Sequence, residues 1–406
     1  MQQESVLLHP IIIATAKKGL AVTGETPAGE RGIAMEEKAF CRSAYHMIAL
    51  VCCALKGKKP SAALIGKLDL SALFEVCERH NLTACTAYAL ESAGVHDRNF
   101  TEAKNKAIRK NILLDTERKR ILDRLEAEGI WYMPLKGAIL KDWYPKLGMR
   151  QMSDNDILYD VSARSRIREI MTEMGFSCER YGVGHNDPYH KPPVFNFEMH
   201  HILFSAVSDK KIFGYYENIK DKLCRDENKQ YAYHFRQEDF YIYVTAHEHK
   251  HFIRGGTGVR TLADTYVILQ KFGKKYDWDY IHAELRKLGI AEFESQNRAL
   301  AEKVFSGLQL SKEEKALLRY YIMSGTYGTQ TNQFRNNLKE ADNSKFRYYL
   351  HRLFPPLNFV KVYYPFFYRH KWLLPVMWVF RPVKGLFVNR EKLRNEFDTL
   401  FRKKKA

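Results

Sequence analysis

Residues 131–160 constrain the fold of this chain more than any other stretch of its sequence. A short apolar run ends at Gly137, a helix-like segment follows, and the stretch closes on two carboxylates, Asp154 and Asp156, that lead into Ile-Leu-Tyr. This order predicts a strand, a tight turn, a helix, a loop and a second strand. Because side chains alternate along a strand, Asp154 and Asp156 are expected on one face, about 7 Å apart.

Two carboxylates at the start of a strand suit a divalent cation better than a hydrophobic core. Mg²⁺ is a hard ion that takes oxygen ligands and is often held by one or two carboxylates together with substrate phosphates. A second strand-like run, residues 194–203, alternates between apolar side chains and a polar set that includes Glu198 and His200. Glu198 is therefore the expected third carboxylate, with His200 and Asp160 as the alternatives.

Three motifs follow one another in this part of the chain: L-K-G before a helix, R-x-x-x-D-x-D from Arg150 to Asp156, and E-x-H at Glu198. In this order they resemble the uncharacterised bacterial nucleotidyltransferases of the DNA polymerase β superfamily. The resemblance covers roughly residues 40 to 390. It continues downstream in H-x-x-x-H (His247, His251), G-x-R-x-L-x-D (Gly258, Arg260, Leu262, Asp264) and Ser324-Gly-Thr-Tyr-Gly328.

The resemblance implies an α+β fold, in which a small mixed β-sheet forms the nucleotidyltransferase core between amino-terminal and carboxy-terminal helical regions. In that superfamily three carboxylates hold two Mg²⁺ ions for in-line attack on the α-phosphate. Asp154, Asp156 and Glu198 match this pattern and are the expected catalytic residues and metal ligands. The implied reaction moves a nucleoside monophosphate from an NTP to a hydroxyl of an acceptor, which is left open as a small molecule, sugar, protein or RNA.

The nucleotide is expected to contact Lys136, Gly137 and Arg150. In the superfamily a glycine turn holds the triphosphate and usually pairs two small residues, so Lys136 departs from the pattern and would add a cationic contact. The planar guanidinium of Arg150 suits phosphoryl oxygens. Its alternative role is to pair with Asp154.

A rival motif lies in the second half of the chain. His247, Glu248 and His251 match H-E-x-x-H, the pattern of zinc metalloproteases. On a helix the two histidines would lie one turn apart on one face, and Glu248 could activate water. Asp264 is the only third ligand we consider, because no histidine follows at the expected spacing. A zinc protease is therefore the first alternative function.

The carboxy-terminal tail carries much of the formal net charge of +18. Residues 351–406 hold 13 Lys and Arg against 3 Asp and Glu, which favours contact with an anionic membrane surface or another polyanion. The nine apolar residues 372–380 are too few to span a bilayer, so no transmembrane segment is expected. A non-catalytic nucleic-acid or membrane-surface binding protein is the second alternative function. Because prolines interrupt the tail, we expect its aromatic residues to lie as a strap across the folded body.

The compartment and the domain boundaries follow from composition and periodicity. Seven cysteines without C-x-x-C spacing indicate a reducing compartment, so a cytoplasmic protein is expected. A helix capped by Ser162 is predicted for residues 162–174, and a loop for residues 182–193. The expected regions are a disordered or non-native extension (1–34), an amino-terminal helical region (35–128), the nucleotidyltransferase core (129–236), a helical domain (237–350) and a basic aromatic tail (351–406).

Overall fold

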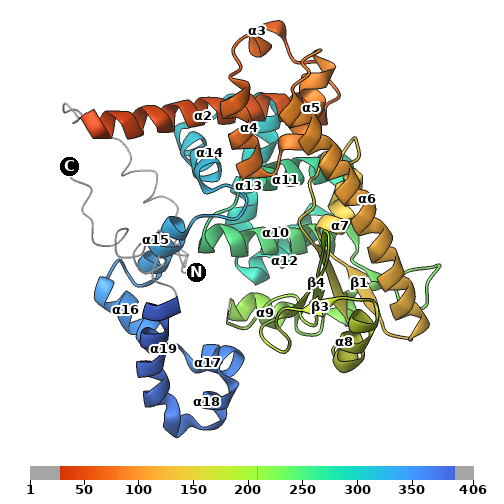
Figure 1. The fold of residues 1–406 in the computed structure, drawn as a ribbon, viewed down its shortest axis with the longest axis vertical. Coiled ribbons are helices and arrows are strands. Elements are labelled where there is room, and N and C mark those ends of the chain that lie inside the picture. Colours follow the sequence, from red (N-terminus) through yellow and green to blue (C-terminus); the bar gives the residue numbers. More distant parts are fainter. Residues whose placement is uncertain (1–27, 208, 389–406) are drawn as a thin grey trace, which may run out of the picture.

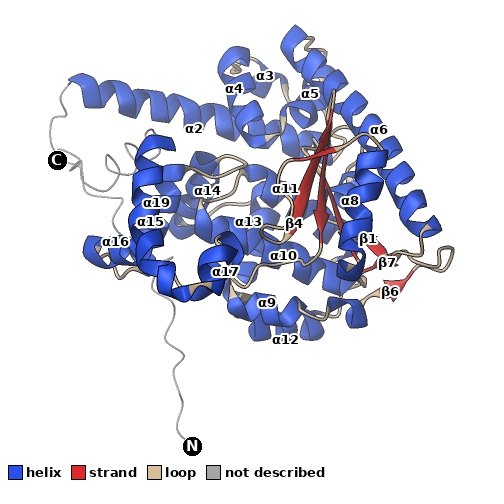
Figure 2. Cartoon of the chain, turned by 60° about the horizontal axis from the view of Figure 1, so that its bottom comes forward, coloured by secondary structure: helices blue, strands red, loops and turns tan. Residues whose placement is uncertain are grey.

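The computed structural model describes residues 28–207 and 209–388 as a largely helical body around one small sheet (Figure 1). The predicted α+β fold with helical regions on either side of the sheet in sequence is confirmed. Figure 2 shows the central strands as a narrow layer among the helices.

The amino-terminal helices form where apolar residues recur at three- and four-residue spacing. They are α2 (Ala28–Leu55), α3 (Ala62–Ile65), α4 (Leu70–His80), α5 (Thr83–Ser92) and α6 (Arg98–Ala127). The apolar pattern of residues 68–92 gives two helices, because Asn81 adopts a left-handed conformation with φ of 52° that ends α4. Asp69 and Asp97 accept hydrogen bonds from amides in the first turns of α4 and α6, which caps both helices.

Helix α2 extends into the region expected to be disordered. Residues 28–34 belong to it, whereas residues 1–27 of the expected extension lie outside the described residues. Within the described chain, one segment, Glu37–Leu55 of α2, is long and apolar enough to cross a membrane by length and composition. Met47, Leu50 and Val51 of this segment are fully buried against other helices, so it contributes to a hydrophobic core.

The central sheet is mixed and has the strand order β1-β2-β5-β4-β3. Its strands are β1 (Tyr132–Pro134), β2 (Asn155–Tyr159), β3 (Ser177–Cys178), β4 (Asn186–Lys191) and β5 (Phe195–His200). Strands β2 and β5 are parallel, and the other neighbours are antiparallel. A separate two-stranded sheet pairs β6 (Cys224–Arg225) with β7 (Tyr233–His234).

Strand β4 lies within residues 182–193, so the loop predicted there is wrong for six of its residues. Glycines and prolines on either side of the strand hid it from the sequence pattern. Pro188 within the strand has no N–H to donate, but its carbonyl oxygen accepts a hydrogen bond from the amide of Glu179 (3.0 Å). Antiparallel pairing with both β5 and β3 then fixes β4 inside the sheet.

The connections around β2 are short helical turns. The predicted helix after Gly137 is divided into α7 (Gly137–Leu140) and the 3₁₀ turn η1 (Lys141–Trp143). Where a helix was predicted from Ser162, the 3₁₀ turn η2 (Val161–Ala163) comes first, and the α-helix α8 (Arg164–Glu173) begins two residues later than predicted. The predicted cap is also wrong, because Asp160 accepts the hydrogen bond from the amide of Ser162 (3.0 Å).

The second half of the chain is helical, as expected for residues 237–350. The elements are α9 (Lys210–Tyr216), η3 (Ile219–Lys222), α10 (Gln237–Arg254), α11 (Val259–Phe272), α12 (Trp278–Leu288), α13 (Ala291–Ser306) and α14 (Lys312–Ser324). Side chains of α11, α13 and α14 share one hydrophobic core with α2, α4 and α5. The amino-terminal and carboxy-terminal helices therefore meet in a common core.

Different helices cover the two faces of the central sheet. Ile157, Tyr159 and Phe197 are buried against α6 and α8. Leu158, which points to the opposite face, lies in a second core with α9, α10 and α12. Because residues alternate along β2, Asp156 shares the face of Leu158 and is directed toward the α10 side.

Two glycine-rich loops, residues 255–258 and 324–328, meet with their backbones in direct contact, and we call this contact the glycine seam. A Cβ on Gly328 would lie 2.4 Å from the carbonyl oxygen of Gly255, and one on Gly258 would lie 2.8 Å from the carbonyl carbon of Gly325. The amide of Thr329 donates to the carbonyl of Gly255 (2.8 Å). Only glycine allows backbones to approach this closely.

The carboxy-terminal part forms a group of short helices at the lower end of the molecule in Figure 1. They are α15 (Gln330–Glu340), α16 (Lys345–Leu353), α17 (Leu357–Tyr363), α18 (Pro365–Arg369), η4 (Lys371–Leu373) and α19 (Leu374–Val388). The expectation of aromatic residues strapped onto the body is wrong, since Trp372 is 76% exposed. Proline-interrupted helices are too short to bury both sides, and few of their apolar side chains, such as Tyr348, Val360 and Met377, are enclosed.

A buried histidine at the end of α4 makes stability depend on pH. His80 is fully buried, and its Nδ1 accepts a hydrogen bond from the amide of Val259 (3.2 Å). Burial lowers the pKa of His80 to about 4, and the charge of Arg79 acts in the same direction. The unfolded chain takes up this proton near pH 6.5, so the free energy of unfolding should fall by up to roughly 3 kcal/mol as the pH drops toward 4.

We therefore expect His80→Asn, which keeps an acceptor but cannot be protonated, to weaken the acid dependence of urea unfolding between pH 7 and pH 4.5. His96→Asn is the matched control, because His96 is exposed. A wild-type pH dependence in His80→Asn would contradict the prediction.

Candidate active site

The polar side chains of β2 and β5 gather on the sheet face that α10 covers. Asp156 and Glu198 stand opposite each other in the parallel register of these strands. Glu198 and His200 alternate with Phe197 and Met199, which point into the core on the other face. One oxygen of each carboxylate and one imidazole nitrogen of His200 lie within 4.8 Å of one another. The two strands thus bring Asp156, Glu198 and His200 together.

Asp156 is buried and held by two partners. Its Oδ2 lies 3.0 Å from Nζ of Lys136, and its Oδ1 lies 3.0 Å from Nε2 of His200. Burial alone would raise the pKa of Asp156, but the charge of Lys136 and the hydrogen bond from His200 lower it. Burial would likewise lower the pKa of His200, but its hydrogen bonds with Asp156 and Glu198 raise it. Asp156 therefore stays anionic.

Asp154 lies one residue before β2 and is half-buried. Burial raises the pKa of Asp154 to about 6, and the charge of Asp156 acts in the same direction against that of Lys136. The two aspartates thus differ in their readiness to bind a proton. Asp154 is the one that becomes neutral in mild acid.

Glu198 is the more accessible carboxylate of the site, with 32% of its side chain exposed. Its Oε2 accepts a hydrogen bond from Nδ2 of Asn186 (2.5 Å) and lies 3.5 Å from Nε2 of His200. Asn186 belongs to β4, so it was missed together with that strand. Asp160, an alternative to Glu198 in the sequence, caps η2 instead.

Lys136 reaches the site from a strained turn. Its backbone has φ of 35° and ψ of −104°, a left-handed conformation that glycine adopts more readily than lysine. Nζ lies between Oδ2 of Asp156 (3.0 Å) and Nε2 of His247 (2.9 Å). Burial opposes its charge, yet Asp156, Tyr243 and Asp154 together raise the pKa of Lys136. The lysine therefore neutralises the carboxylates from within the site.

Gly137 is required by space rather than by its backbone angles. A Cβ at this position would lie 2.8 Å from Nη1 of Arg150 and 3.0 Å from Cε of Met152. Real Cβ atoms do not approach other atoms so closely, so any side chain here would displace one of these neighbours.

Arg150 is fixed by a buried ion pair. Its Nε donates to Oδ1 of Asp264 (2.8 Å), and its Nη2 donates to Oδ2 (2.9 Å). The hydroxyl of Tyr144 donates to the same Oδ1 (2.6 Å). The carboxylate partner of Arg150 is thus Asp264 and not Asp154, because α11 carries Asp264 up to the guanidinium.

The H-E-x-x-H motif does not have the geometry of a zinc protease. His247 and His251 lie one turn apart on α10, with their Nε2 atoms 3.1 Å apart. Glu248 points to another side of α10, where Oε2 accepts long hydrogen bonds from Thr265 and Asn297 (both 3.4 Å). A protease of this type needs the glutamate beside the metal-bound water. The geometry therefore disfavours this alternative.

Further cations border the carboxylates and were not among the predicted site residues. Burial lowers the pKa of Arg260, with Arg150 acting in the same direction, and burial and Lys136 lower the pKa of Lys250 to about 8. Lys110 donates to the carbonyl of Ser153 (3.0 Å), next to Asp154. Arg260 and Lys250 lie within motifs that the sequence displays, whereas Lys110 lies on α6 without any local signal.

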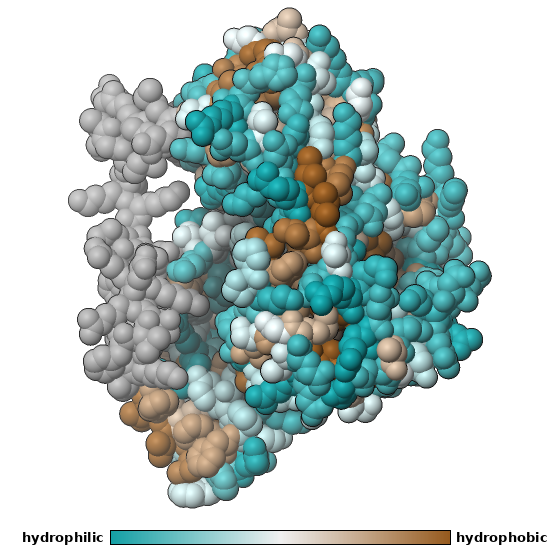
Figure 3. All heavy atoms as spheres, turned by 45° about the vertical axis from the view of Figure 1, so that its right-hand side comes forward, coloured by the Kyte–Doolittle hydropathy of each residue, from teal (hydrophilic) through white to brown (hydrophobic). Residues whose placement is uncertain are grey.

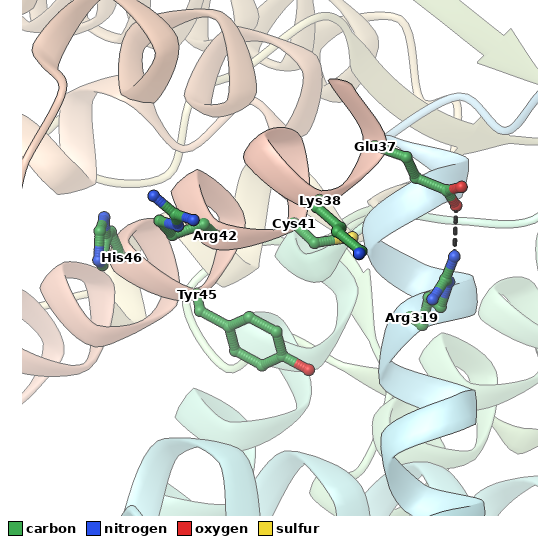
Figure 4. A pocket seen from close by; sticks show the side chains of 7 residues that line it. All are labelled: Glu37, Lys38, Cys41, Arg42, Tyr45, His46 and Arg319. Atoms are coloured by element: carbon green, nitrogen blue, oxygen red, sulfur yellow. Dashed lines mark hydrogen bonds and ion pairs between the residues drawn. The ribbon is translucent and has the colours of Figure 1, made fainter. Parts of the chain in front are cut away.

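A surface hollow of about 480 Å³ lies elsewhere, between α2 and α14 (Figure 4). It shares no residue with the carboxylate group. Two of its side chains, Glu37 and Arg319, are joined by an ion pair of 2.6 Å. We assign this hollow no part in the candidate active site.

Comparison with known proteins agrees with the order of the motifs. The model of a family described as "Uncharacterised nucleotidyltransferase" matches residues 66–306, which is more than half of the chain and includes the predicted site residues. No curated protein and no solved structure shows significant similarity to the chain.

The packing around Gly137 can be tested by one substitution. We expect Gly137→Ala to lower the free energy of unfolding by about 1–3 kcal/mol, because the new methyl group must displace Arg150 or Met152. Gly214→Ala is the matched control, since a Cβ at that helical position meets nothing within 4 Å. Equal urea-unfolding midpoints for both variants would refute the steric argument.

Proposed function

This chain belongs to the family of uncharacterised nucleotidyltransferases, and we propose that it transfers a nucleoside monophosphate from an NTP to a hydroxyl group of an acceptor, with Mg²⁺ as its metal ion. The observation that carries this proposal is the register pairing of Asp156 with Glu198 on adjacent parallel strands. Asp154 stands immediately before the same strand.

The donor set fits a hard divalent cation. Asp156 and Glu198 offer carboxylate oxygens, which Mg²⁺ prefers, and they lie in one group with His200. Asp154 lies outside this group, one residue before β2, and would bring a third carboxylate. Lys136 already supplies positive charge beside Asp156. When bound, the metal ions would lower the pKa of the acceptor hydroxyl and neutralise charge on the leaving pyrophosphate.

The surrounding cations suit the triphosphate. Arg260 is half-buried beside Arg150 and, within the described part of the chain, has no carboxylate at ion-pair distance. A phosphate group would relieve the repulsion between these two guanidinium groups. Lys136 is placed to pass from Asp156 to a phosphate oxygen. Gly137 has no side chain, so the turn can lie close to Arg150. Its proposed contribution to nucleotide binding is this close packing.

The acceptor side is assigned to Glu198. Its side chain is 32% exposed, and its hydrogen bond from Asn186 fixes one of its oxygens. The other oxygen can accept the proton of an acceptor hydroxyl. His200 holds Asp156 in place, since its Nε2 contacts the Oδ1 of that residue. We place this reaction in the cytoplasm, which the seven free cysteines support.

Replacing either aspartate by its amide tests the proposal. We expect Asp154→Asn and Asp156→Asn each to slow nucleotide transfer at least about 10²-fold, because a neutral amide oxygen binds Mg²⁺ poorly. Pyrophosphate release from each of the four NTPs, in the presence of cell extract as a source of acceptors, is the measurement. Asp160→Asn, which alters a cap outside the site, should keep wild-type turnover. Wild-type activity in both site variants would sink the proposal.

Protonation of Asp154 should set the pH dependence of metal binding. Its pKa is raised to about 6, so protons compete with the cation below that value, and affinity should rise with pH and level off above pH 6. Binding of Mn²⁺, a spectroscopic substitute for Mg²⁺, can be followed by electron paramagnetic resonance from pH 5 to 7.5. Asp154→Asn should flatten this profile while Asp160→Asn keeps it. A flat profile in the unmodified protein would contradict the assignment.

A further inference from the structure

The carboxy-terminal helices combine positive charge with an absence of acidic residues. From Lys345 to Val388 the sequence contains eight Lys or Arg and no Asp or Glu. Several of these cations, including Lys361, Arg369 and Lys371, are exposed. The nearest carboxylate before this stretch, Asp342, is paired with Arg347. These helices therefore present a positively charged surface.

Helix α16 leaves an apolar stripe exposed. Phe346, Tyr349, Leu350 and Leu353 recur at spacings of three and four residues, which places them on one face of the helix. Their exposed fractions range from 36% to 78%. Tyr348, by contrast, is buried. The stripe is thus not the side that α16 packs against its neighbours.

Helix α19 repeats this arrangement. Val376, Val379 and Phe380 have the same helical spacing and are 56%, 69% and 49% exposed. Met377 between them is fully buried. Trp372, just before the helix, is 76% exposed. Figure 3 shows apolar side chains gathered at the lower end of the molecule, where these short helices lie.

We propose that helices α16–α19 dock the protein onto the surface of an anionic lipid bilayer. Exposed apolar stripes enter the boundary between headgroups and acyl chains, while lysine and arginine side chains attract anionic headgroups. Trp and Tyr favour this boundary because their rings are apolar with one polar atom. Helices of 5 to 15 residues cannot span a bilayer, so they lie in its plane.

Charge and composition favour a bilayer over two other occupants. A second copy of the chain would bring like charges face to face across a two-fold axis. An RNA would neutralise the cations and could stack its bases on exposed rings such as Trp372, but Leu350, Leu353 and Val379 would remain in water. This inference is independent of the proposed reaction.

The test is cosedimentation of the full-length protein with vesicles of phosphatidylcholine, alone or mixed with phosphatidylglycerol. We expect binding to the mixed vesicles that weakens as salt is added, and much weaker binding to phosphatidylcholine alone. Trp372→Ser should reduce binding at least about tenfold, because a large apolar side chain no longer leaves water. Lys371→Glu should reduce it at least about fivefold.

Matched controls lie outside these helices. Leu308→Ser removes an apolar side chain that is 60% exposed, and Lys312→Glu reverses an exposed charge on α14. Both should bind as the unmodified protein does, and all four variants should keep its melting temperature. Absence of binding to anionic vesicles at low salt, or equal losses in the controls, would overturn the proposal.

Two further measurements identify the competing occupants. If analytical ultracentrifugation shows a dimer, and Trp372→Ser dissociates it, then the partner of these helices is a second copy of the chain and not a bilayer. Filter binding tests for RNA. If the protein retains RNA, Lys371→Glu abolishes this retention, Trp372→Ser leaves it intact and vesicles are not bound, then the partner of these helices is a nucleic acid and not a bilayer. Either result would overturn the assignment to lipid.

Discussion

The buried ion pair between Arg150 and Asp264 fixes the position of the sheet relative to the helices of the second half of the chain. It joins the loop that precedes β2 to helix α11 through two hydrogen bonds, and the hydroxyl of Tyr144 adds a third to the same carboxylate. Removing one partner of such a pair costs about 3–5 kcal/mol, because the other charge stays buried. The pair also fixes Nη1 of Arg150 against Gly137. The position of the turn that carries Lys136 therefore depends on this pair.

The central part of the fold could be predicted because its side chains obey a strict alternation. Glu198 and His200 are directed to one face while Phe197 and Met199 enter the core, and this follows from period two alone. The same rule places Asp156 with Glu198 once β2 and β5 pair in parallel. Strand β4 was not predicted, because Pro188 and the nearby glycines are typical of a loop. Asn186, which lies in this strand, was therefore not predicted as a site residue. Local patterns thus revealed the carboxylates but not the neighbour that orients one of them.

Partners from distant segments were beyond the reach of sequence patterns. Arg150 and Asp264 are separated by 114 residues, and only the packing of α11 against the sheet region decides that they meet. Lys136 was expected to face phosphate, yet it also contacts Asp156 and His247 in this structure. The exposure of Trp372 likewise depends on how few residues the short helices can enclose. Such features follow from tertiary packing rather than from local propensity.

The glycine seam packs two loops of the chain so closely that they must move together. Gly328 meets the backbone of Gly255 and Gly258 meets the backbone of Gly325, so side-chain rotation at these points cannot absorb a displacement of either loop. One loop leads into α11, which carries Arg260 and Asp264, and the other leads through α15 toward the cationic helices. A displacement of the carboxy-terminal helices would therefore also move the start of α11, the helix that carries Asp264 and the arginine that we propose binds phosphate.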